Sequence, residues 1–334
     1  MLTDLPLNEL EVYRGESAEP ADFDQFWQDT LGEAREAAFA PILEPVATSL
    51  TGIDVYDLTF SGFGGDPVRA WLRLPQGARS LPALVQYQGY GGGRGHPLEN
   101  LQWAACGYAH LLMDTRGQGS VWSRGDTDDP HGGGPQAPGM VTRGIESPRS
   151  YYYRRLIADA VRAVDAVREI ARSGRLPQLG AAGSGGAKVA VMGHSQGGLL
   201  ALAAAGLAAD LAAVVARVPF LCDPRRAVNV TDAKPFSELT EYLAIHRDSA
   251  DAAFTTLSYS DGVNFARRAA APALMTAALM DAIVPPSTVF AAYNNYAGPK
   301  EIKVWPFNGH ESGGPQEDQL ALDFLARRLT AKPA

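Results

Sequence analysis

The chain has few cysteines, no excess of positive charge and no long apolar run. Its 334 residues include two cysteines, Cys106 and Cys222, too few for a disulfide-rich secreted domain; one bridge is an alternative, but we favour two free thiols in a reducing compartment. The formal net charge is −8 and no basic patch is present, so neither nucleic acid nor an anionic membrane surface is an expected partner. No run of about 18 apolar residues occurs, so we expect no membrane-spanning helix.

The start of the chain also lacks the features of a targeting segment. Residues 1–6 have neither the basic start nor the apolar core of a signal peptide, so we expect a soluble, cytoplasmic protein. The composition that is present, 46% hydrophobic and 20% charged residues, is ordinary for a globular protein with a large core. No internal repeat interrupts the chain, and we expect one domain over residues 1–334.

Apolar runs of strand length alternate with helical patterns along most of the chain. This order predicts an α/β fold, with a mostly parallel twisted sheet, right-handed crossovers and flanking helices. An antiparallel hairpin is expected at 46–60 and 68–74. Further strands are predicted at 84–88, 108–114, 188–192, 214–220, 273–280 and 301–306, and the main helices at 22–38, from 148 onward, and at 199–209, 285–296 and 316–329.

Three segments depart from this alternation. Residues 1–40 are expected to form an extended N-terminal arm followed by a helix. Residues 115–147 form a loop rich in Gly, Pro and Asp that is too long to be idle in a compact domain. Residues 223–268 have helical patterns without any strand signal, which predicts a helical segment inserted between two strands.

A strand-to-helix turn at residues 193–197 is the most informative local feature. The sequence there, Gly-His-Ser-Gln-Gly, fits the G-x-S-x-G pattern of a nucleophile elbow, in which a strained turn exposes a serine. Glycines are needed on both sides of that serine because the neighbouring backbone comes very close. The pattern alone is weak in a glycine-rich chain, but a strand before it and a helix after it make Ser195 the candidate nucleophile.

A serine hydroxyl needs a base and an orienting acid, which in this kind of fold follow the nucleophile along the chain. Of the two later histidines, His246 lies in a helical pattern, whereas His310 lies in a loop directly after the last strand, so we favour His310. Asp281 directly follows an apolar strand and is the candidate acid, with Asp223 as its rival.

The oxyanion formed during acyl transfer needs two N–H donors. The main chain of Gln196, directly after the serine, is one candidate, and that of Tyr90, in the glycine-rich loop after the strand at 84–88, is the other. Neither a phosphate-binding loop nor a dinucleotide-binding motif fits those glycines. We therefore expect no metal and no organic cofactor.

Taken together, these motifs resemble the acetyl xylan esterases and cephalosporin-C deacetylases of carbohydrate esterase family seven, members of the α/β-hydrolase superfamily. The resemblance runs nearly end to end. It is carried by Arg116-Gly-Gln-Gly, Met140-Val-Thr-Arg-Gly-Ile, Tyr151-Tyr-Tyr-Arg, Ser195-Gln-Gly-Gly, Thr256-Leu-Ser-Tyr, Asp281 with Pro285-Pro-Ser-Thr-Val-Phe, and His310-Glu311.

The resemblance implies site residues that agree with the chain order: Ser195 as nucleophile, Asp281 as acid, His310 as base, and main-chain donors at Tyr90 and Gln196. It implies that Arg116 and Glu311 support the site, and that the chain forms a homo-oligomer, a hexamer of paired subunits whose active sites face an inner cavity. One departure is visible, because the family usually has a glycine where this chain has His194.

The function implied by the resemblance is that of a serine esterase. It would remove acetyl groups from small substrates, such as acetylated xylo-oligosaccharides, cephalosporin C and related short-chain acyl esters. Two alternatives stay open: a serine peptidase or acyltransferase on the same fold, and a binding or assembly protein that has kept the fold without catalysis.

Overall fold

A single mixed sheet organises the computed structural model, which describes residues 4–132, 134–180 and 187–329. The order of its nine described strands is β1-β2-β3-β5-β4-β6-β7-β8-β9. From β5 to β9 neighbouring strands are parallel, whereas β1, β2 and β3 join one edge antiparallel. The strands are β1 Ile42–Pro45, β2 Ile53–Ser61, β3 Pro67–Pro75, β4 Ala83–Tyr87, β5 Ala109–Met113, β6 Val189–His194, β7 Ala213–Arg217, β8 Ala273–Ala278 and β9 Lys300–Trp305.

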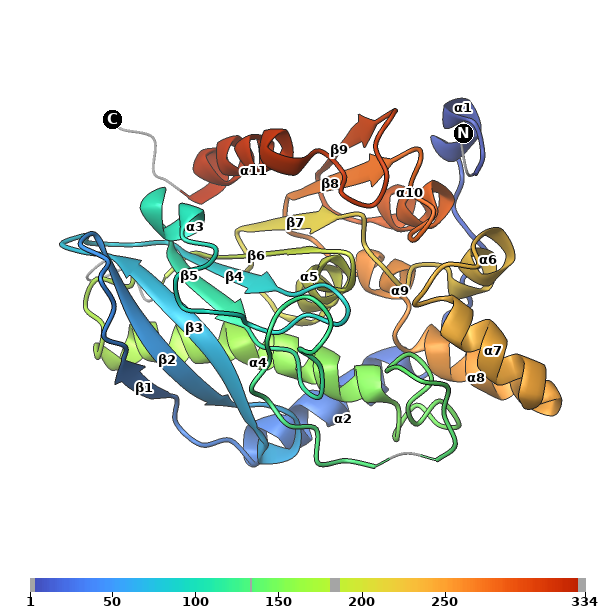
Figure 1. The fold of residues 1–334 in the computed structure, drawn as a ribbon, viewed down its shortest axis with the longest axis horizontal. Coiled ribbons are helices and arrows are strands. Elements are labelled where there is room, and N and C mark those ends of the chain that lie inside the picture. Colours follow the sequence, from blue (N-terminus) through green and yellow to red (C-terminus); the bar gives the residue numbers. More distant parts are fainter. Residues whose placement is uncertain (1–3, 133, 181–186, 330–334) are drawn as a thin grey trace.

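Helices cover both faces of the sheet (Figure 1). Helices α2, α4 and α5 lie on one face, and α3 and α11 lie on the other. The inserted helices α6 to α9 gather near the carboxyl ends of the parallel strands. The helices are α1 Leu7–Leu10, α2 Phe23–Glu36, α3 Gln102–Ala105, α4 Tyr152–Ser173, α5 Gln196–Leu207, α6 Pro224–Val230, α7 Ser237–Ile245, α8 Ala250–Ser258, α9 Gly262–Ala266, α10 Pro286–Asn295 and α11 Gly314–Leu329.

The central strands read as continuous apolar runs because both of their faces are buried. Successive side chains alternate between two cores, as in β4, where Val85 packs into the large core shared with α4 and α5 and Leu84 packs into a smaller core under α11. β6 repeats this alternation with Val191 and Met192. The two cores hold the sheet rigid, so the loops at its carboxyl edge start from fixed positions.

The predicted α/β fold is confirmed, including the helices inserted between β7 and β8. Two details were wrong. The N-terminal arm contains a single helical turn, α1, and the first hairpin strand begins at Ile53, while residues 42–45 form a separate edge strand. β1 is mostly exposed and ends in a proline, so its sequence has little strand character, and pairing with β2 forms it.

The long loop at 115–147 has neither helix nor strand among its described residues. The two cysteines are free, as we favoured, with Cys106 exposed and Cys222 buried. Among the described helices, none has both the length and the apolar character needed to cross a membrane.

Candidate active site

Ser195 lies at a strained turn between β6 and α5. Its φ of 57° and ψ of −118° are unusual for a residue with a side chain. Two main-chain hydrogen bonds to the neighbouring connection hold this turn, because the Ser195 N–H donates to the Arg217 carbonyl (2.9 Å) and the Ser195 carbonyl accepts from the Phe220 N–H (3.0 Å). This is the strained, braced geometry that a nucleophile elbow requires.

The two glycines of the motif are required by close backbone contacts. A Cβ atom at Gly193 would lie 2.2 Å from the main chain of Gly197, and one at Gly197 would lie 2.2 Å from the main-chain oxygen of Tyr87. Backbone atoms on both sides cannot move aside as a flexible side chain would. The elbow therefore packs directly against the end of β4, where the glycine-rich loop begins.

Gly197→Ala is expected to destabilise the fold by about 3 kcal/mol or more, because the added methyl group overlaps backbone on a neighbouring strand. Urea unfolding of the variant measures this loss. Gly52→Ala is the matched control, since nothing lies within 4 Å of a Cβ atom there. Equal stability of the two variants would contradict the close packing.

His310 and Asp281 form a hydrogen-bonded pair at the same edge of the sheet. The Nδ1 atom of His310 lies 2.9 Å from Oδ2 of Asp281. Asp281 is fully buried, and its other oxygen accepts hydrogen bonds from the main-chain N–H groups of Ile283 (2.8 Å) and Val284 (2.9 Å). The carboxylate is thus fixed by its own turn, and it can orient the imidazole with Nε2 directed away from it.

The elbow and the histidine loop meet through His194. The ring of His194, the residue before Ser195, contacts the ring of His310 with centroids 4.9 Å apart. Ser195 itself is 5% exposed. Three segments that are far apart in the sequence, ending at Ser195, Asp281 and His310, therefore converge at one place.

Asp223 and His246, the alternative candidates for the acid and the base, make contacts elsewhere in the structure. The Asp223 carboxylate accepts a hydrogen bond from the Tyr13 hydroxyl (2.9 Å), which ties the N-terminal arm to the inserted segment. The ring of His246 stacks on Tyr242 in that segment, with centroids 4.3 Å apart. Both residues thus have structural contacts within or beside the inserted segment.

The two residues expected to supply oxyanion donors are Tyr90, in the loop after β4, and Gln196, the first residue of α5. Within the described residues, the main-chain N–H groups of Tyr90 and Gln196 have no recorded acceptor. Gln196 is the first residue of α5, whose N-terminal N–H groups point toward the elbow. Two such N–H groups close to a nucleophile can bind a developing oxyanion.

The side chain of Gln118 bridges the loop after β4 and the side chain of Gln196, a role that our sequence analysis did not assign. Its Oε1 accepts from the Gly91 N–H (2.6 Å), and its Nε2 donates to Oε1 of Gln196 (2.9 Å). The Gln196 side chain in turn donates to the Gln88 carbonyl (3.3 Å). The loop before α5 and the loop after β4 are thereby held in register. The Arg116-Gly-Gln-Gly motif was the only sequence signal for it.

Glu238 of α7 is a second residue that the sequence analysis missed. The Tyr90 hydroxyl donates to both of its carboxylate oxygens (2.8 and 2.9 Å), and the Val141 N–H donates to Oε2 (3.1 Å). Burial raises the pKa of Glu238, and the hydrogen bond from Tyr90 acts in the opposite direction. This carboxylate connects the inserted segment, the long loop and the loop after β4. No local motif marks it.

Aromatic side chains line one side of Tyr90. The ring of Phe220 lies 6.4 Å from Tyr90 and 4.6 Å from Phe236, measured between centroids. Trp103 packs into the core under α11 on the other face of the sheet. A small apolar acyl pocket is therefore expected beside Phe220 and not beside Trp103.

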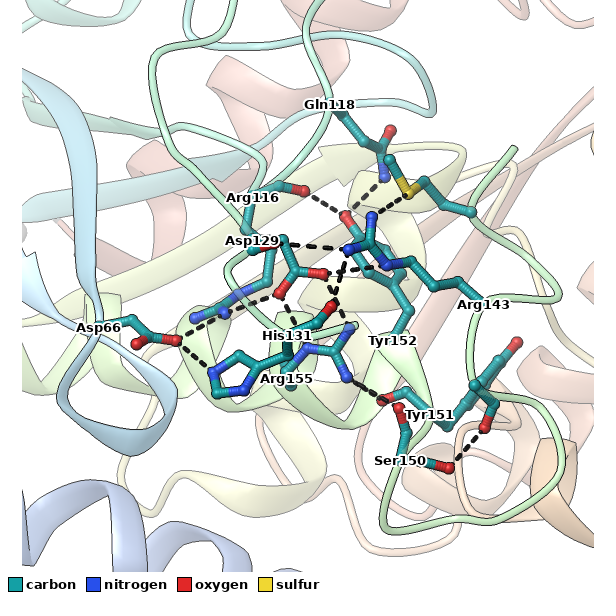
Figure 2. Close-up of polar contacts among 12 residues, drawn as sticks. Asp66, Arg116, Gln118, Asp129, His131, Arg143, Ser150, Tyr151, Tyr152 and Arg155 are labelled. Atoms are coloured by element: carbon teal, nitrogen blue, oxygen red, sulfur yellow. Dashed lines mark hydrogen bonds and ion pairs between the residues drawn. The ribbon is translucent and has the colours of Figure 1, made fainter. Parts of the chain in front are cut away.

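A buried charge network anchors the long loop behind the site (Figure 2). The fully buried guanidinium of Arg116 pairs with Asp159 (2.5 Å), Asp66 (3.0 Å) and Asp129 (3.3 Å). Arg155 also pairs with Asp129 (2.8 Å). Burial alone would raise the pKa of Asp129, but hydrogen bonds from Arg155 and the charge of Arg116 lower it below its ordinary value.

Arg116→Gln is expected to destabilise the protein by about 3–5 kcal/mol, because it leaves buried carboxylates without their cation. Arg124→Gln is the control, since Arg124 is 81% exposed where it pairs with Asp126, and it is expected to change little. Because the pKa of Asp129 is lowered on folding, its stabilising contribution is present above the ordinary pKa of an aspartate and is lost at lower pH. The difference between wild type and Arg116→Gln, measured by denaturant unfolding, should therefore shrink as the solution is acidified.

The fold and the elbow, histidine and carboxylate at its edge define an α/β-hydrolase. The family model for acetyl xylan esterase (AXE1) matches residues 1–328. The chain belongs to the acetyl xylan esterase family.

Individual relatives agree with this membership. The structure of an acetyl xylan esterase from Paenibacillus sp. R4 superimposes with a TM-score of 0.87 at 37% identity, covering 97% of this chain and 100% of that one. The acetyl xylan esterase 1 of Thermoanaerobacterium sp. JW/SL YS485 gives a TM-score of 0.87 at 33% identity, covering 98% and 100%. The acetyl esterase Axe7A of Xylanibacter ruminicola is 28% identical over 304 residues, 90% of this chain, and the chain spans 65% of that relative's length.

More distant structures share the fold alone. An acylaminoacyl peptidase of Pyrococcus horikoshii has a TM-score of 0.59 at 16% identity, covering 85% of this chain and 43% of that one. More than half of the peptidase chain thus lies outside the shared region.

Proposed function

We propose that this protein is a serine esterase that removes acetyl groups from small acetylated substrates. The observation that carries the proposal is the convergence of the Ser195 elbow with the hydrogen-bonded His310–Asp281 pair (2.9 Å) at one edge of the sheet. Membership of the acetyl xylan esterase family supports the acetyl group as the acyl part.

In the proposed reaction, the Ser195 hydroxyl attacks the ester carbonyl carbon while Nε2 of His310 takes its proton. Asp281 stabilises the imidazolium, and the Tyr90 and Gln196 N–H groups bind the oxyanion. The tetrahedral intermediate then breaks its bond to the alcohol, which leaves with the proton from His310. Water, deprotonated by His310, attacks the acetyl-enzyme in the same way and releases acetate and free Ser195.

The substrate class is proposed from the relatives, which are acetyl xylan esterases and an acetyl esterase. Acetylated xylo-oligosaccharides are the favoured substrates, with cephalosporin C and related short-chain acyl esters as further candidates. A cytoplasmic location and a hexamer with inward-facing sites are part of the proposal; size-exclusion chromatography with light scattering tests the hexamer.

The second candidate is a serine peptidase or acyltransferase, which the same triad could serve. Membership of the acetyl xylan esterase family favours the esterase over the peptidase, because that family model matches residues 1–328.

The test compares purified protein on p-nitrophenyl esters from acetate to octanoate, on acetylated xylo-oligosaccharides and on peptide amides. Cleavage of acetyl esters that falls steeply with acyl length is expected. Preferential cleavage of peptide amides, or no turnover of any ester, would overturn the proposal.

A further inference from the structure

His194 makes direct contact with the catalytic histidine of the proposed reaction. The two rings are 4.9 Å apart between centroids and inclined by 68°, an edge-to-face arrangement. His194 is the last residue of β6, in register with Arg217 of β7, so its ring projects from the rigid centre of the sheet.

His194 also borders a cavity. This cavity, of about 480 Å³, is lined by His194 together with polar side chains that include Gln88, Glu99 and Asn100. His310 is not among the residues that line it. His194 is therefore the residue that contacts His310 and also lines this cavity.

The loop that carries His310 is held at both of its ends. The Met280 N–H donates to the Asn308 carbonyl (3.0 Å), and the Ser312 hydroxyl donates to Oε1 of Glu317 (3.1 Å). Between these contacts Asp281 holds Nδ1 of the His310 ring (2.9 Å), and the His194 ring packs against the same imidazole.

The His194 ring is uncharged where it packs against His310. Burial lowers the pKa of His194 to about 3, and the positive charges of His310 and Arg217 act in the same direction, whereas the main chain of His310 acts in the opposite direction. The ring is therefore neutral at ordinary assay pH. The charged groups near His310 are then Asp281 from the end of β8, the adjacent Glu311, and Arg217 behind His194, which is paired with Asp318 (2.6 Å).

We propose that His194 is a positioning residue for the catalytic base: its ring packs edge-on against His310 and holds the imidazole in line with Ser195. The proposal rests on the proposed function, because it assigns a role relative to His310 in that reaction. It concerns a residue in which this chain departs from the glycine expected from the resemblance.

The experiment compares His194→Gly, His194→Phe and His194→Asn with wild type, using p-nitrophenyl acetate from pH 5 to 9. A small misplacement of a reacting group costs up to about 100-fold, so His194→Gly is expected to lower kcat about 10- to 100-fold with little change in KM. The acid limb of the kcat/KM profile should move to higher pH, because water entering the vacated space stabilises the protonated imidazole. His194→Phe keeps a ring and should recover most of kcat, whereas His194→Asn keeps a polar group without a ring and should not.

His246→Asn is the matched control, since it removes a histidine that also packs on an aromatic ring but lies in the inserted segment. It is expected to leave kcat and the pH profile unchanged. Thermal melting of every variant identifies any that is unfolded at the assay temperature. If His194→Gly is unfolded there, the comparison of His194→Phe with His194→Asn tests the proposal.

Wild-type kcat and pH profile in His194→Gly, or higher activity in His194→Asn than in His194→Phe, would overturn this inference while leaving the proposed function intact. A wild-type protein that turns over no ester overturns the proposed function and this inference with it.

Discussion

Replacing Ser195 with alanine is expected to lower kcat on p-nitrophenyl acetate by about 10⁴- to 10⁶-fold, since residues of a serine triad act as a unit and the loss of one removes most of their joint effect. The hydroxyl oxygen is the atom that forms the covalent bond, and no other side chain at the elbow can replace it. Stopped assays with very high protein concentration are needed to measure so small a residual rate.

The stability of this variant is an essential control. The alanine keeps the backbone at φ 57°, and Ser195 makes its recorded main-chain hydrogen bonds through atoms that the substitution leaves in place. A melting temperature close to that of wild type is therefore expected. An organophosphonate should add its mass to wild type and not to Ser195→Ala. Retention of most esterase activity by the variant would contradict the assignment of the nucleophile.

Asp281→Asn is expected to lower kcat by about 10⁴-fold at neutral pH, because an amide in place of the carboxylate favours the wrong tautomer of the histidine. In the structure, Oδ2 of Asp281 accepts from Nδ1 of His310. If an amide nitrogen takes that place, it donates to Nδ1, which leaves the proton on Nε2, so the imidazole can no longer accept the proton of Ser195. Steady-state kinetics from pH 6 to 10 measure the effect.

Asp223→Asn is the matched control for this change, because Asp223 was the rival acid and is also buried. Its carboxylate bonds to Tyr13, so the variant is expected to loosen the N-terminal arm and to keep kcat close to wild type. A large loss of kcat in Asp223→Asn together with an active Asp281→Asn would reverse the assignment of the acid.

Much of the fold could be predicted from the order of the strand and helix patterns. The central strands are fully buried, so their sequences are continuous apolar runs, and glycine and proline mark the turns between them. Edge strand β1 was missed because it lacks such a buried, apolar sequence. It is four residues long and mostly exposed, so its apolar pattern is weak and its pairing with β2 is a long-range effect.

The candidate residues at the catalytic edge could also be chosen from sequence, because each directly follows a strand. The carboxyl ends of parallel strands meet at one edge, so Ser195 after β6, Asp281 after β8 and His310 after β9 were expected to converge there. The structure brings Asp281 and His310 into hydrogen-bond contact, and His194 brings the elbow against the histidine loop.

The sequence by itself determined the order of the elements and the positions at which reactive side chains follow them, because both depend on local patterns of apolar residues and glycine. Only the tertiary structure decided what supports those side chains: Gln118 between the Gly91 N–H and the Gln196 side chain, Glu238 hydrogen-bonded to Tyr90, Arg116 among three aspartates, and His194 against His310. The physical reason is that these contacts join residues tens to more than a hundred positions apart, and a hydrogen bond or ring contact over such a separation leaves no periodic trace in the chain.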